Sequence, residues 1–169
     1  MKQVKIESEQ QLVLFDLAAE HYAIDSMNVR EIIRMQSITK IPGAPASVEG
    51  VVNLRGKVTP VMDLRKRLGL VVGQESKETR IVVVDVEGQD VGLIVDGVSE
   101  VLRIPVSVIE ATSAIVAAEE ADYILGVAKL ETKLVILLDI GRLLAAGEKR
   151  MPLGAEAAKH RAEAGAAVS

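Results

Sequence analysis

GVVNLRGKVTPVMD, residues 50–63, places a polar Asn-Leu-Arg-Gly block between two runs of branched aliphatic residues. Its glycines and Lys57 come close to a phosphate-binding loop, but the glycine spacing is too long and no hydroxyl residue follows the lysine. Pro60 also blocks the helix that such a loop requires. Val and Leu on both sides of a Gly-containing turn instead predict two strands, joined at a hairpin tip over residues 53–56.

The same pattern recurs later in the chain. Residues 50–68 align with GVAKLETKLVILLDIGRLL at 126–144, and residues 12–33 align with IVVVDVEGQDVGLIVDGVSEVL at 81–102. The first glycine and the aspartate that follows the last strand are identical in the first pair of segments. Two aligned segments in the same order predict two related subdomains.

Short apolar runs in both halves favour β-strands over buried helices, because they are rich in Val and bounded by turn residues. The runs lie at 12–17, 21–24, 50–54 and 58–62 in the first half, and at 81–86, 91–95, 124–130 and 134–138 in the second. In each half the last run ends in an aspartate, Asp63 or Asp139, that is expected to cap a short Leu-rich helix. The pattern predicts a mainly β protein of two small antiparallel barrels packed together.

The composition limits the classes of function. The chain has 169 residues with one Phe, two Tyr and no Trp, so its core must be built from Val, Ile and Leu. The absence of Cys excludes disulfides, thiolate nucleophiles and Cys-ligated zinc, and a net charge of −4 without a basic block argues against nucleic-acid binding. No signal peptide is visible, and no apolar run approaches the ~20 residues of a bilayer span. We expect a cytoplasmic protein that does not insert into a membrane.

The titratable side chains suggest no catalytic centre. His21 and His160 are the only imidazoles, and His21, near two strand-end carboxylates, is expected to be a solvated turn residue and not a metal ligand. The aspartates that recur in both halves are explained better as turn and cap residues than as one active site. We therefore expect no enzyme activity and no cofactor.

A duplicated scaffold without catalytic residues indicates binding, and its halves differ most at the hairpin tip. Asn-Leu-Arg-Gly at 53–56 is replaced by Lys-Leu-Glu-Thr at 129–132. If the shared Leu points inward, one tip presents a cation and the other an anion. A second difference is Val-Arg-Glu-Ile at 29–32 against Val-Ser-Glu-Val at 98–101. Since Arg is a frequent interface anchor, Arg55 is a candidate contact.

Four longer blocks carry a family resemblance. They are YAIDSMNVREII at 22–33, EGVVNLRGKVTPVMDLRKRLG at 49–69, RIVVVDVEGQDVGLIVDGVSEVL at 80–102 and YILGVAKLETKLVILLDIGRLL at 123–144. In this order they resemble the CheW family, the coupling proteins of bacterial chemotaxis. The extended N-L-R-G-x-[VI]-x-P-[VI]-x-D-L block is the specific signal.

The resemblance implies a CheW-like domain over residues 10–146, built from two pseudo-symmetric five-stranded SH3-like barrels around a shared hydrophobic core, with short helices. We expect the first barrel mostly in 12–70 and the second mostly in 80–140, with strand exchange between them left open. The Ala-rich residues 147–169 have no counterpart in the resemblance, and we expect a disordered tail or a frayed helix there.

The resemblance further implies a non-enzymatic adaptor that connects the cytoplasmic helical tip of chemoreceptors to the regulatory domain of the histidine kinase CheA. In this family the receptor helix lies between the barrels and the Arg of the N-L-R-G block is a principal contact, so the resemblance assigns that role to Arg55 and places Val29 and Glu31 in the same contact. Contact residues for the kinase are not assigned.

Three further positions join the candidate receptor site. Asn53 belongs to the same tip as Arg55, and Gly50 and Gly56 match positions where the family tolerates little bulk. We attribute this intolerance to a tight hairpin turn.

Other functions stay open at this point. The same module could be a CheV-type adaptor or a regulatory domain cut from CheA, although both are disfavoured if the sequence is complete. It could also be a coupling protein of another receptor–kinase array, one that controls pili or gene expression. A hydrolase or small ligand-binding barrel would need convergent titratable groups, which the scarcity of His, Cys and aromatic residues disfavours.

Overall fold

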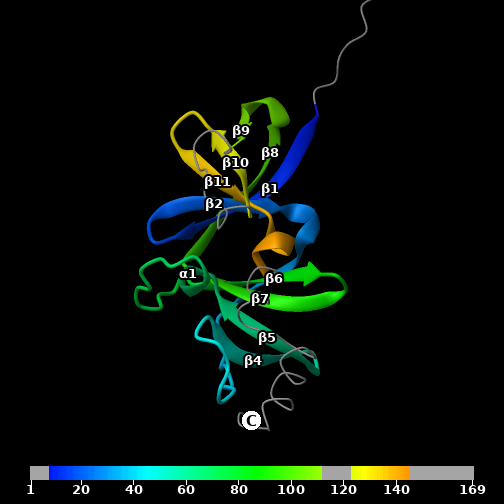
Figure 1. Ribbon diagram of the computed structural model, residues 1–169, viewed down its shortest axis with the longest axis vertical. Helices are drawn as coiled ribbons and strands as arrows, with labels where there is room; N and C mark the ends of the chain where they lie inside the picture. The colour runs from blue at the N-terminus through cyan, green and yellow to red at the C-terminus, as the bar shows by residue number, and fades with distance from the viewer. Residues whose placement is uncertain (1–7, 112–122, 145–169) are drawn as a thin grey trace, which may run out of the picture.

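The computed structural model describes residues 8–111 and 123–144, which form two β-sheets stacked along the long axis of the molecule (Figure 1). Sheet A contains β1 (Glu9–Leu17), β2 (Glu20–Asp25), β8 (Gly97–Pro105), β9 (Ile109–Ala111), β10 (Ile124–Lys129) and β11 (Leu134–Leu138). Sheet B contains β3 (Val29–Arg34), β4 (Val48–Leu54), β5 (Lys57–Asp63), β6 (Arg80–Val86) and β7 (Gln89–Val95). The short helices are η1 (Ser26–Asn28), α1 (Leu64–Arg67) and η2 (Val106–Val108), and residues 140–144 are also helical. The predicted mainly β, two-barrel fold is confirmed.

The two sheets do not coincide with the two halves of the sequence. Sheet A has the strand order β8-β1-β2-β11-β10-β9, and sheet B has the order β3-β6-β7-β5-β4. The first hairpin of each half, β1–β2 or β6–β7, therefore lies in the sheet formed mainly by the other half. The expected ranges 12–70 and 80–140 are thus each divided between the two sheets, and the strand exchange that the sequence left open is present.

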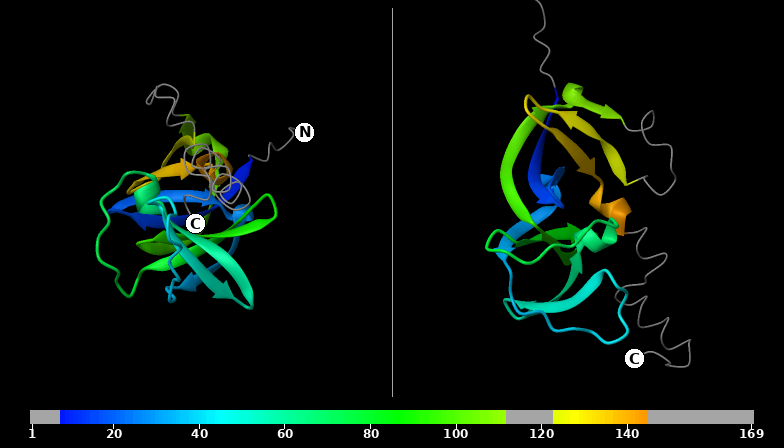
Figure 2. Two further views of the ribbon diagram at one scale, coloured as in Figure 1. Left: turned by 60° about the horizontal axis from the view of Figure 1, so that its bottom comes forward. Right: turned by 90° about the vertical axis from the view of Figure 1, so that its left-hand side faces the viewer.

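The exchange preserves the symmetry of the repeat. Strands β1 and β8 pair antiparallel with Val13 opposite Val101, and β6 and β3 pair antiparallel with Val82 opposite Ile32. These four residues are equivalent in the sequence alignment. The parallel pairs β2–β11 and β7–β5 also share one register. Both barrels are thus built in the same way, as the two stacked units in Figure 2 illustrate.

Central strands are apolar on both faces because each one lies between a barrel interior and a core shared by the sheets. Along β1, Leu12 and Leu14 face the interior of sheet A, whereas Val13 and Phe15 pack in the shared core. Strand β6 alternates in the same way between the interior of sheet B and the shared core. This arrangement confirms the predicted shared core and explains the continuous apolar runs.

The two strand-end aspartates cap helices, as the repeat predicts. Asp63 Oδ1 accepts a hydrogen bond of 3.0 Å from the backbone N–H of Arg65 at the start of α1. Asp139 Oδ1 accepts one of 3.0 Å from the backbone N–H of Arg142 in the helical residues 140–144. The residues 112–122 and the Ala-rich 147–169 lie outside the described part of the chain.

The β1–β2 hairpin turns at Ala18 and Ala19, whose φ angles are 50° and 69°. A Cβ in this left-handed region costs roughly 1–2 kcal/mol per residue, which is why Gly and Asn dominate such turns. We expect Ala19→Gly to raise the free energy of unfolding by about 0.5–1 kcal/mol, after the entropy that glycine adds to the unfolded chain. Urea denaturation measures this. Ala23→Gly in the buried strand β2 is the control and should be less stable than wild type. An Ala19→Gly protein no more stable than wild type would contradict the left-handed conformation of Ala19.

Candidate protein-binding site

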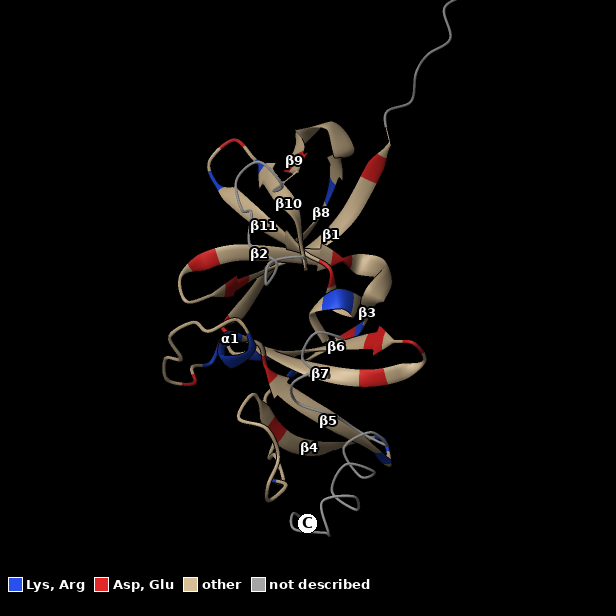
Figure 3. Cartoon of the chain, in the orientation of Figure 1, with Lys and Arg blue, Asp and Glu red and all other residues tan. Residues whose placement is uncertain are grey.

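The β4–β5 hairpin presents a charged tip at the end of sheet B, visible among the Lys and Arg residues of Figure 3. Arg55 and Gly56 form its two-residue turn, with φ angles of 52° and 83°. Asn53 Oδ1 accepts a hydrogen bond of 2.7 Å from the Gly56 backbone N–H and so fixes the turn. Leu54 is buried in the interior of sheet B, as expected, and the Arg55 side chain is 74% exposed.

Arg55 is held in place by Glu31 of β3. Its guanidinium donates a hydrogen bond to the Glu31 carboxylate, although β3 and β4 are the opposite edges of sheet B. The curvature of the sheet therefore brings its first strand against the hairpin tip. This hydrogen bond, and the charge of Glu31, raise the pKa of Arg55 above its ordinary value. Two of the predicted site residues are thus in direct contact.

Val29 belongs to a different environment. It precedes Glu31 on β3 and is half-buried, and its side chain packs against the shared core. The structure therefore places Val29 mainly in packing, with part of its surface open beside η1. Met27 of η1, 87% exposed, is the apolar side chain of this region that reaches solvent.

A second set of ion pairs next to the tip was not predicted from the sequence. Arg30 Nε donates to Asp90 Oδ1 at 2.6 Å, and its NH2 group lies 3.3 Å from Asp85. Lys57 Nζ lies 3.9 Å from the other Asp90 oxygen. These pairs connect β3 to the tips of the β4–β5 and β6–β7 hairpins. No local pattern signals them, because the partners are far apart in the chain.

Gly50 has a different role from the one expected. It lies inside β4, at the end far from the turn, with φ 146°. A Cβ there would collide with the Thr39 carbonyl group, whose carbon is 2.8 Å from the ideal position. At Gly126, its repeat equivalent, an added Cβ would likewise lie only 2.5 Å from the Glu110 carbonyl oxygen. The hairpin turn thus explains Gly56, and the close approach of the Thr39 backbone, which pairs antiparallel with Val51, explains Gly50.

The β10–β11 hairpin of sheet A is the repeat equivalent of the β4–β5 hairpin, and its tip is held by a different cation. Lys133 Nζ lies 3.3 Å from Glu100, the repeat equivalent of Glu31, whereas Glu131 stands at the position of Arg55 and is exposed. The two tips therefore share an ion pair to the third strand of their repeat, but present opposite charges outward. This matches the asymmetry predicted from the sequence.

The His21 imidazole forms a paired contact away from the tip. His21 Nδ1 lies 2.9 Å from Asp16 Oδ1 at the turn of β1 and β2. Both residues line an open cavity of about 860 Å³, together with Asp96, which is itself bonded to Arg65. Within residues 8–111 and 123–144, no group of three His, Cys, Asp or Glu side chains is placed to hold a metal. In the same part of the chain, no helix is long and apolar enough to cross a membrane.

Comparison with known proteins gives a consistent result. A family model described as a CheW-like domain matches residues 11–148. The chain is 36% identical over 142 residues to the chemotaxis protein CheW of Treponema pallidum, covering 82% of this chain and 84% of that protein. It is 34% identical over 140 residues to CheW of Bacillus subtilis, covering 83% and 90%. Protein PilI of Pseudomonas aeruginosa is 33% identical over 92 residues, which cover 54% of this chain and 52% of PilI.

The solved structures agree with the sequences. The crystal structure of the scaffolding protein TtCheW from Thermoanaerobacter tengcongensis matches with a TM-score of 0.77 and 39% identity, over 87% of this chain and 100% of that one. The two joined barrels thus have the fold of a CheW-type scaffold protein. The chain belongs to the CheW family of chemotaxis scaffold proteins, and the resemblance drawn from its sequence is confirmed.

The geometry of Gly50 predicts that its substitution acts through the fold. We expect Gly50→Ala to lower the free energy of unfolding by about 1–3 kcal/mol, because the new Cβ collides with backbone atoms that cannot move aside. Gly97→Ala is the matched control: its Cβ would have its nearest neighbours at 3.6 Å, so its stability should stay within about 0.5 kcal/mol of wild type. Chemical denaturation compares the two variants, and equal stabilities would refute this role of Gly50.

Proposed function

We propose that this protein is a cytoplasmic adaptor that couples the helical tips of methyl-accepting chemotaxis receptors to the regulatory domain of the histidine kinase CheA. Membership of the CheW family supports this role, and the preformed tip of the β4–β5 hairpin is the observation that carries it. The protein would reach the membrane only through its receptor partners, as part of a receptor array.

The receptor would bind as a helix laid against the surface of the barrels near this tip. Arg55 would fix the position of the helix, because its guanidinium is exposed and its planar fork can make several hydrogen bonds at once. Glu31 would hold the Arg55 side chain in one orientation, which lowers the entropy lost on binding. Asn53 and Gly56 would contribute by shaping the turn, and Val29 by the exposed part of its side chain.

The kinase would bind barrel to barrel, since its regulatory domain is expected to have the same fold. Exposed apolar side chains at equivalent places in the two barrels support this part of the proposal. Val58 is 70% exposed at the start of β5, and its repeat equivalent Leu134 is 60% exposed at the start of β11. An adaptor that holds both partners raises the effective concentration of each for the other.

A second candidate is the same coupling role in a receptor–kinase array that controls pili. The similarity to PilI supports it, although only about half of each chain is matched. Binding of fragments from chemotaxis receptors and from pilus-array receptors, measured side by side, separates the two.

The proposed receptor contact predicts a selective loss of binding. We expect Arg55→Glu to weaken the affinity for a receptor cytoplasmic fragment by about tenfold or more, because it reverses the charge of an interface anchor. Affinity for the CheA regulatory domain and the thermal unfolding temperature should stay unchanged. Isothermal titration with each partner provides the measurement.

Lys129→Glu supplies the matched control, since it reverses an exposed charge at the tip of the other barrel. It should leave receptor affinity at the wild-type value. Equal losses in the two variants would point to a nonspecific effect of net charge, against a contact at Arg55. Wild-type protein that binds neither partner would overturn the adaptor proposal itself.

A further inference from the structure

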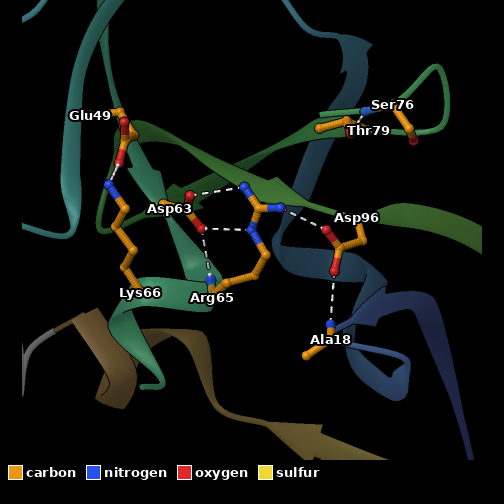
Figure 4. A network of polar contacts seen from close by, with 8 residues as sticks. All are labelled: Ala18, Glu49, Asp63, Arg65, Lys66, Ser76, Thr79 and Asp96. Atoms are coloured by element: carbon orange, nitrogen blue, oxygen red, sulfur yellow. Dashed lines mark hydrogen bonds and ion pairs between the residues drawn. The ribbon is translucent and has the colours of Figure 1, made fainter. Parts of the chain in front are cut away.

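The four-residue helix α1 carries Arg65, whose side chain lies between Asp63, at the end of β5, and Asp96 (Figure 4). The Arg65 side chain is only 6% exposed. Its Nε and NH2 groups donate to the two carboxylate oxygens of Asp63 at 3.0 and 2.9 Å, and its NH1 group donates to Asp96 Oδ1 at 2.7 Å. The guanidinium is therefore held in a plane by Asp63 and directed at Asp96.

Asp96 connects this arginine to sheet A. It lies where the chain passes from β7 in sheet B to β8 in sheet A. Its Oδ2 atom accepts a hydrogen bond of 2.7 Å from the Ala18 N–H, and its own N–H donates to the Asp16 carbonyl oxygen at 2.9 Å. Arg65 is thus linked through one carboxylate to the β1–β2 turn of the opposite sheet.

Arg67 makes a second connection. Its NH2 group donates to the Leu143 carbonyl oxygen at 3.0 Å, and its guanidinium lies 5.9 Å from the centre of the Tyr123 ring. Tyr123 precedes β10 and Leu143 follows β11, so both partners belong to the side of sheet A. In the sequence repeat, Gly141 and Leu143 stand at the positions of Arg65 and Arg67, so the second half has no equivalent pair.

The two arginines add a constraint that the shared core lacks. Burial of aliphatic side chains holds the sheets together, but the hydrophobic effect has no direction and resists sliding only weakly. The bidentate contact with Asp63 fixes the plane of the Arg65 guanidinium, so its single hydrogen bond to Asp96 has a defined distance and direction. Burial makes misalignment costly, because an unpaired guanidinium or carboxylate would lose its hydration without compensation.

We propose that Arg65 and Arg67 are positioning residues that fix the angle between the two barrels and so set the geometry in which the adaptor holds its partners. The statement about partners rests on the proposed function; the statement about the barrels does not. Contacts of α1 within sheet B, such as the 2.6 Å pair between Lys66 and Glu49, have no part in this role.

The test uses the absence of Cys from the chain, which allows spin labels to be placed at two chosen sites. Gln89→Cys on β7 and Thr132→Cys beside β11 are both exposed and lie on different barrels. Double electron–electron resonance then measures the distribution of distances between them. We expect Asp96→Ala to broaden this distribution about twofold, because it removes the carboxylate that orients Arg65 toward sheet A while Asp63 still neutralises the arginine.

Lys66→Ala is the matched control, since it removes an ion pair of the same helix that stays within sheet B. Its distance distribution should coincide with that of the parent. Arg67→Ala tests the second connection separately and keeps the experiment informative if Asp96→Ala fails to fold. A sharp, parent-like distribution in the folded variants of Asp96 and Arg67 overturns the proposal, whatever the partners of the protein are.

Binding measurements then test the consequence for the adaptor. The affinity of the variants for each single partner should equal that of wild type. The coupling factor is the ratio of the affinity for the kinase fragment with the receptor fragment bound to the affinity without it. In the variants this factor should fall about tenfold, toward a value of one. Coupling that stays intact despite a broadened distribution would overturn the statement about partners, and wild type that binds neither fragment would instead refute the proposed function.

Discussion

Each sheet of this protein is completed by a hairpin that the other half of the chain supplies, and the rest of the structure depends on this exchange. Neither half can satisfy the backbone hydrogen bonds of its own strands without β1–β2 or β6–β7 from its counterpart. Folding must therefore join segments that are distant in the sequence, which slows the search for the native state. Stability is a property of the pair of barrels, because both contribute side chains to the shared core.

The exchange also explains how the candidate binding site is built. Strands β3 and β4 are the edges of sheet B, with the other half's hairpin between them, and the curvature of that sheet brings Glu31 to Arg55. The tip is then fixed locally by Asn53 and globally by this ion pair. Gly50 supports the same strand from the far end, where it lets the backbone at Thr39 come close. Three independent contacts thus support the same conformation of the tip.

The sequence contained much of the fold but not its connectivity. The bounds of strands with two buried faces were predicted to within a few residues, because unbroken aliphatic runs indicate such strands. Strands β3, β8 and β9 were not recognised, because β3 alternates between exposed and half-buried residues, β8 is mostly exposed in its middle, and β9 has only three residues. The sequence left strand exchange between the barrels open and could not decide it, since the two hairpins are similar in sequence. Arg55 was found through its motif, whereas its contact with Glu31 and the pairs of Asp90 required the tertiary structure.

The identical registers of the two barrels have a consequence for the origin of the chain. A half-length chain with this topology could complete its sheet only by trading hairpins with a second copy, which describes a symmetric, domain-swapped homodimer. In such a dimer every residue would occur twice, so both tips would carry the same charge. A single chain that contains both halves is free of that restriction, and Arg55 and Glu131 occupy equivalent positions at which the two halves carry opposite charges.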